Sequence, residues 1–328
     1  MRRLLDITPD STTAMSRGAG PSKTAFVLSG GSSLGAIQVG MIQALMEAGI
    51  KPDFLLGTSV GAINATWLAT QPDLEGAHRL AEIWSGLRRQ DVFPLNPWAG
   101  ARGLLGRSNH VISNSGLRTI LEKNLRIQRL EETAVPVHVI TTDLKSGRAV
   151  VLSSGPAIPA LLASTAIPGV FPPVTIGRRD LVDGGVANHT PIAAAIELGA
   201  TRVVVLPIGY PWVRNQPTNA LGMALHALAR FVEQRLEAEA RAYRQAAEIL
   251  MLPTVDSLSV SPADFSRTQD LIKLAYRSSR RYLTTAASRT PAFLPTEVGR
   301  SRQVRVASLA RKPALTVVGM SHAAAPAA

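Results

Sequence analysis

Short apolar runs alternate with helical patterns along this sequence, and the alternation limits the folds that the chain can adopt. Runs of β-type composition occupy residues 24–29, 53–57, 137–143, 148–154, 179–184 and 202–209. Helical patterns lie between several of them, over residues 34–48, 60–70, 74–87, 114–124 and 190–198. Strands that are apolar on both faces and separated by helices are typical of a largely parallel sheet covered on both sides. We therefore predict an α/β fold, a three-layer sandwich around a mainly parallel central sheet.

The rest of the chain adds smaller features to this sheet. Ser146 and Gly147 in DLKSGRA are turn residues between two β-type runs, so we expect one antiparallel pair there. Two helical patterns follow the last run, over residues 221–248 and about 266–284, each with an apolar stripe. We expect flexible tails at 1–23 and 300–328, one α/β domain over 24–212, and a helical extension over 213–299 packed on that domain.

Composition excludes several classes of chemistry. The chain of 328 residues contains no cysteine, which rules out disulfides, thiolate metal sites and a cysteine nucleophile, and fits a reducing compartment. Residues 1–23 carry three arginines but lack the apolar stretch of about 7–15 residues found in secretory signals. Apolar stretches elsewhere are cut by turn residues before reaching the length of about 18 that indicates a membrane span. We expect a cytoplasmic protein, at most peripheral at a membrane.

The formal net charge of +12 is concentrated in one part of the chain. The segment 267–312 holds eleven Lys and Arg residues and only two acidic ones. Aromatic residues are few among these cations (Tyr276, Tyr282 and Phe293), fewer than a base-stacking surface requires, so we expect no nucleic-acid partner. An anionic membrane surface fits the same charge. A basic face in contact only with solvent fits it equally well.

The stretch LLGTSVGAI places Ser59 between Gly57 and Gly61, where a short apolar run meets a helical pattern. G-x-S-x-G at a strand-to-helix turn is the nucleophile-elbow pattern, in which the serine takes strained backbone angles and the glycines remove side chains that would clash. The helix that begins near Val60 also directs its amides and positive dipole end toward the serine. Ser59 is therefore a candidate nucleophile.

A second strand-to-helix turn, LSGGSSLGAIQ, supplies candidate donors for an oxyanion. After the run that ends near Ser29, the residues Gly30, Gly31 and Ser32 lead directly into a helix and leave consecutive backbone amides unpaired. A dinucleotide site competes with this interpretation. Its fingerprint needs glycine where Ser32 stands and an acidic residue at the end of the second strand, whereas Asp53 precedes that strand.

Two candidates for the base lie close together in RDLVDGGVANHTP. Asp183 ends a predicted strand, and Gly184 and Gly185 after it allow the carboxylate to lie close to a neighbouring loop. A carboxylate within hydrogen-bond reach can take the serine proton directly. His189 follows Asp183 in the chain, which gives the order Ser, Asp, His expected of an α/β-hydrolase triad. It remains a minor alternative for the base.

Four blocks in order resemble the bacterial patatin-like phospholipases: the glycine turn, the serine turn, ASTAIPGVFPPV and LVDGGVANHTPI. The resemblance covers roughly residues 24–210, and it implies a Ser-Asp dyad that hydrolyses acyl esters of lipids without a histidine, a cofactor or a metal. By this resemblance Ser59 is the nucleophile, Asp183 is the general base, and the amides of Gly30, Gly31 and Ser32 form the oxyanion hole. The supporting glycines are Gly35, Gly57, Gly61, Gly184 and Gly185.

The glycine turn departs from the family pattern at two positions. Ser32 stands where the family usually has a third glycine, and Leu34 stands where it usually has a basic residue. The predicted function is a lipid acyl hydrolase, that is, a phospholipase A, a lysophospholipase or an esterase. The alternative is a lipid-binding or regulatory protein of the same fold with little turnover. Nucleotide binding at the glycine turn ranks third.

Overall fold

The computed structural model describes residues 22–94, 109–209, 234, 236, 238–255, 260–289 and 316–318. The expected tails and most of the expected helix over 221–248 lie outside the described residues. The structure does place a short strand, β9 (Thr316–Val318), inside the segment expected to be the C-terminal tail.

The described strands form one mixed sheet of nine strands, in the order β5-β6-β3-β2-β1-β7-β8, with β4 beside β3 and β9 beside β4. They are β1 (Thr24–Leu28), β2 (Phe54–Thr58), β3 (Val137–Asp143), β4 (Ala149–Leu152), β5 (Val174–Ile176), β6 (Arg179–Asp183), β7 (Arg202–Leu206), β8 (Glu248–Met251) and β9. The centre from β3 to β8 is parallel. Antiparallel pairs join β3 to β4, β3 to β6, and β5 to β6.

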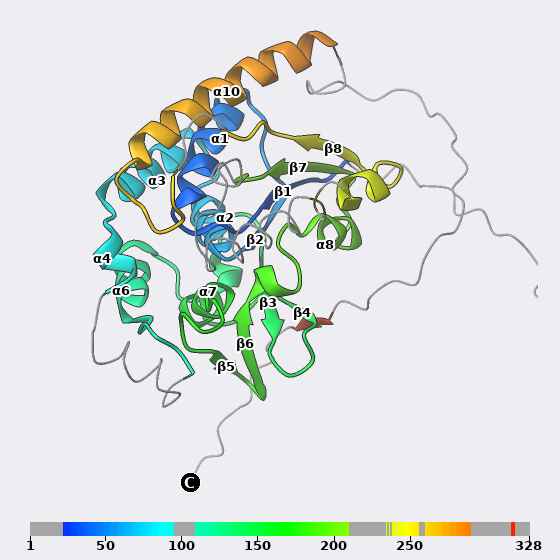
Figure 1. Cartoon of the computed structure of the whole chain (residues 1–328). Coiled ribbons are helices and arrows are strands. Elements are labelled where there is room, and N and C mark those ends of the chain that lie inside the picture. The colour runs from blue at the N-terminus through cyan, green and yellow to red at the C-terminus, as the bar shows by residue number, and fades with distance from the viewer. Residues whose placement is uncertain are drawn as a thin grey trace, which may run out of the picture.

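Helices cover both faces of this sheet, as Figure 1 shows. They are α1 (Gly35–Glu47), α2 (Val60–Thr70), α3 (Leu74–Gly86), α4 (Arg89–Val92), α6 (Ser115–Asn124), α7 (Ala157–Ser164), α8 (Ile192–Glu197) and α10 (Thr268–Arg289). The predicted three-layer α/β architecture is confirmed.

Alternate residues of β1 divide between two hydrophobic cores. Phe26 and Leu28 belong to the larger core, which includes apolar residues of α1, α2, α3 and α10. Ala25 and Val27 belong to the smaller core, with Ile192 of α8. Because successive side chains of a strand point to opposite faces, a strand that is apolar throughout indicates a sheet buried on both sides.

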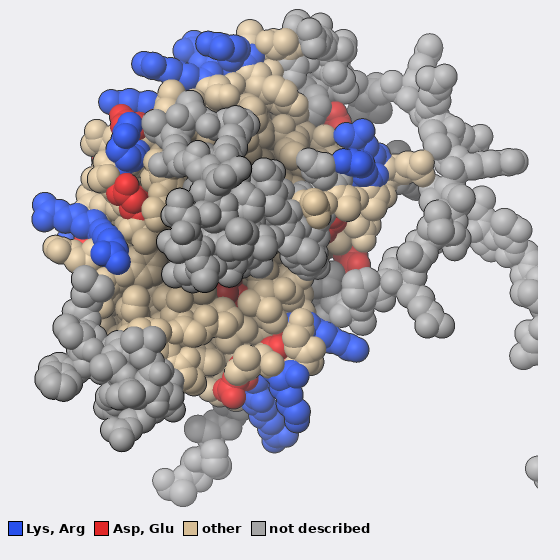
Figure 2. Space-filling model, viewed as in Figure 1, with Lys and Arg blue, Asp and Glu red and all other residues tan. Residues whose placement is uncertain are grey.

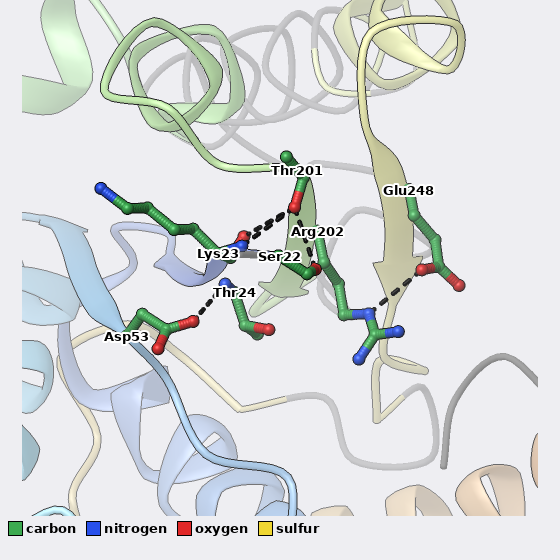
Figure 3. Close-up of polar contacts among 7 residues, drawn as sticks. All are labelled: Ser22, Lys23, Thr24, Asp53, Thr201, Arg202 and Glu248. Atoms are coloured by element: carbon green, nitrogen blue, oxygen red, sulfur yellow. Dashed lines mark hydrogen bonds and ion pairs between the residues drawn. The ribbon is translucent and has the colours of Figure 1, made fainter. Parts of the chain in front are cut away.

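Polar contacts fix the strands at the edge of the sheet where β1, β2, β7 and β8 begin (Figure 3). The Thr24 amide donates to Oδ2 of Asp53 at 2.6 Å, and the Lys23 amide donates to Oγ1 of Thr201 at 3.0 Å. Arg202 forms an ion pair with Glu248 at 3.1 Å. Asp53 therefore lies at the opposite end of its strand from the glycine turn, too far along the sheet to bind a ribose there, which weighs against the dinucleotide interpretation.

Helix α10 packs closely across α1 at Gly40. A Cβ atom on Gly40 would lie 2.2 Å from the carbonyl oxygen of Ile272, so only glycine allows the two backbones this approach. Residues 213–299 were expected to extend the α/β domain, and their division from residues 24–212 remains a prediction.

Several short elements differ from the expected pattern. Strands β5 and β8 and helix α7 were not anticipated, and Glu248–Met251 continues a helical pattern in sequence but forms a strand beside β7. A run of three apolar residues such as Ile249–Met251 satisfies either periodicity, so its position at the sheet edge decides the outcome.

Candidate active site

Ser59 occupies the sharp turn between β2 and α2. Its backbone angles are φ 55° and ψ −127°, in a region that residues other than glycine rarely adopt. Such a conformation costs on the order of 1–3 kcal/mol and persists only where the surroundings impose it. The side chain is buried, and its hydroxyl lines an apolar pocket.

The two glycines of the motif allow this turn to form. A Cβ atom on Gly57 would lie 2.3 Å from the carbonyl oxygen of Gly61, and one on Gly61 would lie 2.4 Å from that of Leu28. Helix α2 thus lies directly against β1 and β2, and the motif glycines are required by close backbone approach.

The sheet order brings Asp183 to Ser59, although the two residues are 124 positions apart in sequence. In the register, Thr58 pairs with Ile140 of β3, and the next residue of β3, Thr141, pairs with Asp183 of β6. The Ser59 hydroxyl donates to Oδ2 of Asp183 at 2.6 Å. The Gly185 amide donates to the other carboxylate oxygen, Oδ1, at 2.7 Å.

Burial makes this carboxylate unusually basic. Desolvation raises the pKa of Asp183 from its ordinary value to about 6, while the hydrogen bonds from Ser59 and Gly185 act in the opposite direction. Desolvation dominates because only 6% of the residue is exposed and no cation pairs with it within the described residues. Asp183 is thus ionised at neutral pH yet able to accept a proton.

Ser164, at the end of α7, holds the backbone of the serine turn. Its hydroxyl accepts a hydrogen bond from the Ser59 amide at 2.9 Å and donates to the carbonyl of Ile140 at 2.6 Å. This residue had no assigned role in the sequence, although it lies inside the block ASTAIPGVFPPV. No local pattern distinguishes a serine that supports a turn from any other buried serine.

The glycine turn lies beside Ser59, as expected from the parallel pairing of β1 and β2. A Cβ atom on Gly30 would lie 3.2 Å from the Ser59 Cβ. The Gly30 amide donates to the carbonyl of His189 at 3.4 Å, whereas the amides of Gly31 and Ser32 have no acceptor among the described residues. Gly31 and Ser32 have φ values of 151° and 54°, so Ser32 takes a conformation that favours glycine. Within the glycine turn, the amides of Gly31 and Ser32 are thus the ones that donate no hydrogen bond to a described residue.

His189 lies near the pair but not between its members. Its Nε2 would be 3.2 Å from a Cβ on Gly30, and its Nδ1 lies 3.3 Å from the Thr190 hydroxyl. The serine hydroxyl instead points directly at Asp183. The Ser59 hydroxyl and the Asp183 carboxylate are therefore in direct contact, and His189 does not lie between them.

An apolar pocket opens from Ser59 and Ser32 into the space between α2, α3 and α6. Its walls include Ile63 and Trp67 of α2, Trp84 of α3, and Phe265 from the segment before α10. Ile167 and Phe171 of the block ASTAIPGVFPPV also line it, and residues of α3 and α6 contribute a large share of the wall. No charged side chain lines the described part of this pocket.

Comparison with known proteins identifies the family of this chain. A model of the patatin-like phospholipase family matches residues 26–196, more than half of the 328 residues. The chain belongs to the patatin-like phospholipase family. The resemblance drawn from the four sequence blocks is thereby confirmed at the level of the family.

Individual relatives match over the same region. An uncharacterized NTE family protein of Mycobacterium bovis is 29% identical over 192 residues, which is 58% of this chain and 51% of that protein. Lysophospholipase NTE1 of Yarrowia lipolytica is 28% identical over 184 residues, covering 56% of this chain and 12% of that protein. Human GIVD cytosolic phospholipase A2 gives a TM-score of 0.47 at 11% identity, covering 81% of this chain and 60% of that one. The chain thus spans about half of the mycobacterial relative and much less of the Yarrowia lipolytica protein.

Burial of Asp183 predicts a pH-dependent gain in stability when it is replaced by asparagine. The folded carboxyl has a higher pKa than the unfolded one, so wild-type stability falls as the pH rises from about 4 to about 6. Asparagine cannot ionise and avoids this loss. At pH 8 Asp183→Asn should therefore be more stable than wild type by about 3 kcal/mol, and near pH 4 by close to zero. Urea unfolding at both pH values measures the difference.

Asp180→Asn, on the same strand but exposed, provides the matched control and should show no such gain. An Asp183→Asn protein that is no more stable than wild type at pH 8 would contradict the effect of burial.

Proposed function

We propose that this protein hydrolyses carboxylic esters of fatty acyl lipids, with Ser59 as nucleophile and Asp183 as general base. The observation that carries the proposal is the hydrogen bond of 2.6 Å from the Ser59 hydroxyl to Asp183 at the mouth of an apolar pocket. Membership of the patatin-like phospholipase family and the similarity to a fungal lysophospholipase support the same class of reaction.

The first half of the reaction transfers the acyl group to the enzyme. Asp183 accepts the Ser59 proton while Oγ attacks the ester carbonyl carbon, and the carbonyl oxygen takes the negative charge. The amides of Gly31 and Ser32 donate to that oxygen, and donors of this kind contribute about 3–4 kcal/mol each. The tetrahedral intermediate collapses, the ester bond breaks, and the alcohol leaves with the proton held by Asp183.

The second half returns the serine. Asp183 takes a proton from a water molecule while the water oxygen attacks the carbonyl carbon of the acyl-enzyme. The negative charge again develops on the carbonyl oxygen, to which the amides of Gly31 and Ser32 donate. Collapse releases the fatty acid, and the proton returns to Ser59. A carboxylate with a pKa of about 6 suits both directions of transfer near neutral pH.

The pocket recognises the acyl part of the substrate. Its walls are almost wholly apolar, so a hydrocarbon chain placed there is removed from water at about 25 cal/mol per Å². Leu34, where the family usually has a basic residue, is fully buried and offers no charge to a phosphate. The described residues of the pocket thus select substrates by the fatty acyl chain.

Activity on a nitrophenyl octanoate ester tests the two roles. Ser59→Ala and Asp183→Asn should each lower kcat/KM by about 10³-fold or more, because each removes a group that reacts in the transition state. Wild-type kcat/KM should fall below about pH 6 as Asp183 becomes protonated, instead of below pH 4. Asp180→Asn is the control and should behave as wild type.

An Asp183→Asn protein that retains wild-type kcat/KM would refute the dyad. A folded wild type that binds fatty acid but hydrolyses no ester would support the alternative, a lipid-binding or regulatory protein with little turnover. The observation that favours this alternative is Ser32, whose φ of 54° is adopted at low cost only by glycine.

We further propose that the protein contacts anionic membranes through α10. The outward face of this helix exposes Lys273, Arg277, Arg280 and Arg281, and none of them forms an ion pair with an acidic residue within the described part of the chain. Basic side chains gather along this margin of the molecule in Figure 2, where Figure 1 places α10. The described residues contain no helix long and apolar enough to cross a bilayer. Such a face binds by charge alone.

Vesicle sedimentation tests this contact. Each cation near an anionic surface contributes about 1 kcal/mol, so Arg280→Ser combined with Arg281→Ser should weaken binding to phosphatidylserine vesicles by about 30-fold at low salt. Wild-type binding should fall steeply with salt. The control pair is Lys145→Ser with Arg178→Ser, which removes two exposed cations away from α10. Salt-insensitive binding, or equal losses in both pairs, would contradict the proposal.

A further inference from the structure

We propose that Trp84, Asn64 and Gln38 are positioning residues that couple the apolar pocket to the oxyanion loop, defined here as residues 29–35. Through them, an acyl chain long enough to fill the pocket raises the turnover number as well as the affinity. This inference rests on the proposed hydrolase function and adds a control of that function by acyl length.

The three side chains form a continuous buried chain of hydrogen bonds. The Trp84 indole Nε1 donates to Oδ1 of Asn64 at 2.9 Å. Asn64 Nδ2 donates to Oε1 of Gln38 at 2.9 Å and to the carbonyl of Gly35 at 3.0 Å. Asn64 and Gln38 have no exposed surface, and Trp84 is 4% exposed. Breaking one link would leave buried polar atoms unpaired, which fixes the orientation of each amide.

This chain ends on both sides of the oxyanion loop. Gln38 Nε2 donates to the carbonyl of Ser29 at 2.9 Å and to that of Leu206 at 3.1 Å. The carbonyls of Ser29 and Gly35 are thus both held by side-chain amides, and the candidate oxyanion donors lie between them. Trp84 is the only member of the chain that also lines the pocket.

Trp84 also contacts the loop directly. A Cβ atom on Gly35 would lie 2.8 Å from Cζ2 of the Trp84 ring, so the indole lies against the backbone where the loop enters α1. The indole also stacks on Phe265, with ring centroids 6.2 Å apart and an interplanar angle of 17°. The indole and the backbone of Gly35 are therefore close neighbours.

The segment that carries Phe265 also forms hydrogen bonds with the loop. The Ser33 amide donates to the carbonyl of Pro262 at 3.1 Å, and the Ser33 hydroxyl donates to the carbonyl of Ser261 at 3.2 Å. These residues lie beyond 26–196, the part of the chain that matches the family model. The oxyanion loop is thus fixed between the Trp84 chain and the segment before α10.

The strain in the loop makes this support relevant to turnover. The positive φ of Ser32 is kept only if the surroundings impose it, and oxyanion donors act fully only when their positions are fixed in advance. An acyl chain packed against Trp84 and Phe265 would remove the space into which the indole can move. The binding energy of the acyl chain, which is remote from the reacting ester, then raises kcat.

Kinetics with two nitrophenyl esters, butanoate and decanoate, test the coupling. In the wild type, kcat should be higher for decanoate than for butanoate. Trp84→Phe keeps an aromatic ring but removes the N–H, and it should lower the ratio of the two kcat values by about tenfold while KM for decanoate changes by less than about threefold. Trp67→Phe is the matched control: it makes the same change in the same pocket, at an indole without a hydrogen bond to any described residue, and should keep the wild-type ratio.

The outcomes separate the two proposals. A Trp84→Phe protein with the wild-type ratio, or a Trp67→Phe protein with an equal loss, overturns the coupling while the hydrolase function stands. A wild type inactive on both esters overturns the hydrolase function and the coupling with it. If Trp84→Phe does not fold by circular dichroism, Phe265→Leu removes the stacking contact but no hydrogen bond, and the same ratio decides: a reduced ratio supports the coupling and an unchanged one overturns it.

Discussion

The close approach of α2 to β1 is the constraint on which the candidate site depends. Gly61 lies against the carbonyl of Leu28 at a distance that excludes any side chain, and this contact places the turn after β2 beside the turn after β1. Because β1 and β2 are parallel, both turns emerge at the same edge of the sheet. The proposed nucleophile and oxyanion donors are neighbours as a result, and β6 needs only to end beside them to supply the carboxylate.

The site combines several features that oppose stability. Asp183 is buried without a cation among the described residues, and Ser59 and Ser32 adopt positive φ values. Each costs free energy that the surrounding core must offset, and each has a use in the proposed reaction: a carboxylate able to accept a proton, a projecting hydroxyl and fixed amide donors. The large apolar core on the α1, α2 and α3 side of the sheet supplies that support.

The sequence was sufficient for the parts of the site that local pattern determines. Ser59 lies in a five-residue motif at a strand end, and Asp183 lies before two glycines at another. Ser164 and Trp84 were missed because their roles arise from contacts between distant segments. Among the elements, α7 and β5 are too short for their periodicity to stand out, and only the position of β8 beside β7 makes it a strand. Tertiary contacts, which one sequence does not display, decide such cases.

Covalent labelling with a fluorophosphonate, followed by intact-mass and peptide analysis, tests the central claim most directly. We expect a single adduct, on Ser59, whose rate of formation falls as Asp183 becomes protonated below about pH 6. The same reagent should label Asp183→Asn at a small fraction of the wild-type rate, although that variant is folded. An adduct on another serine, or no adduct on a folded wild-type protein, would contradict the assignment of Ser59 as an activated nucleophile.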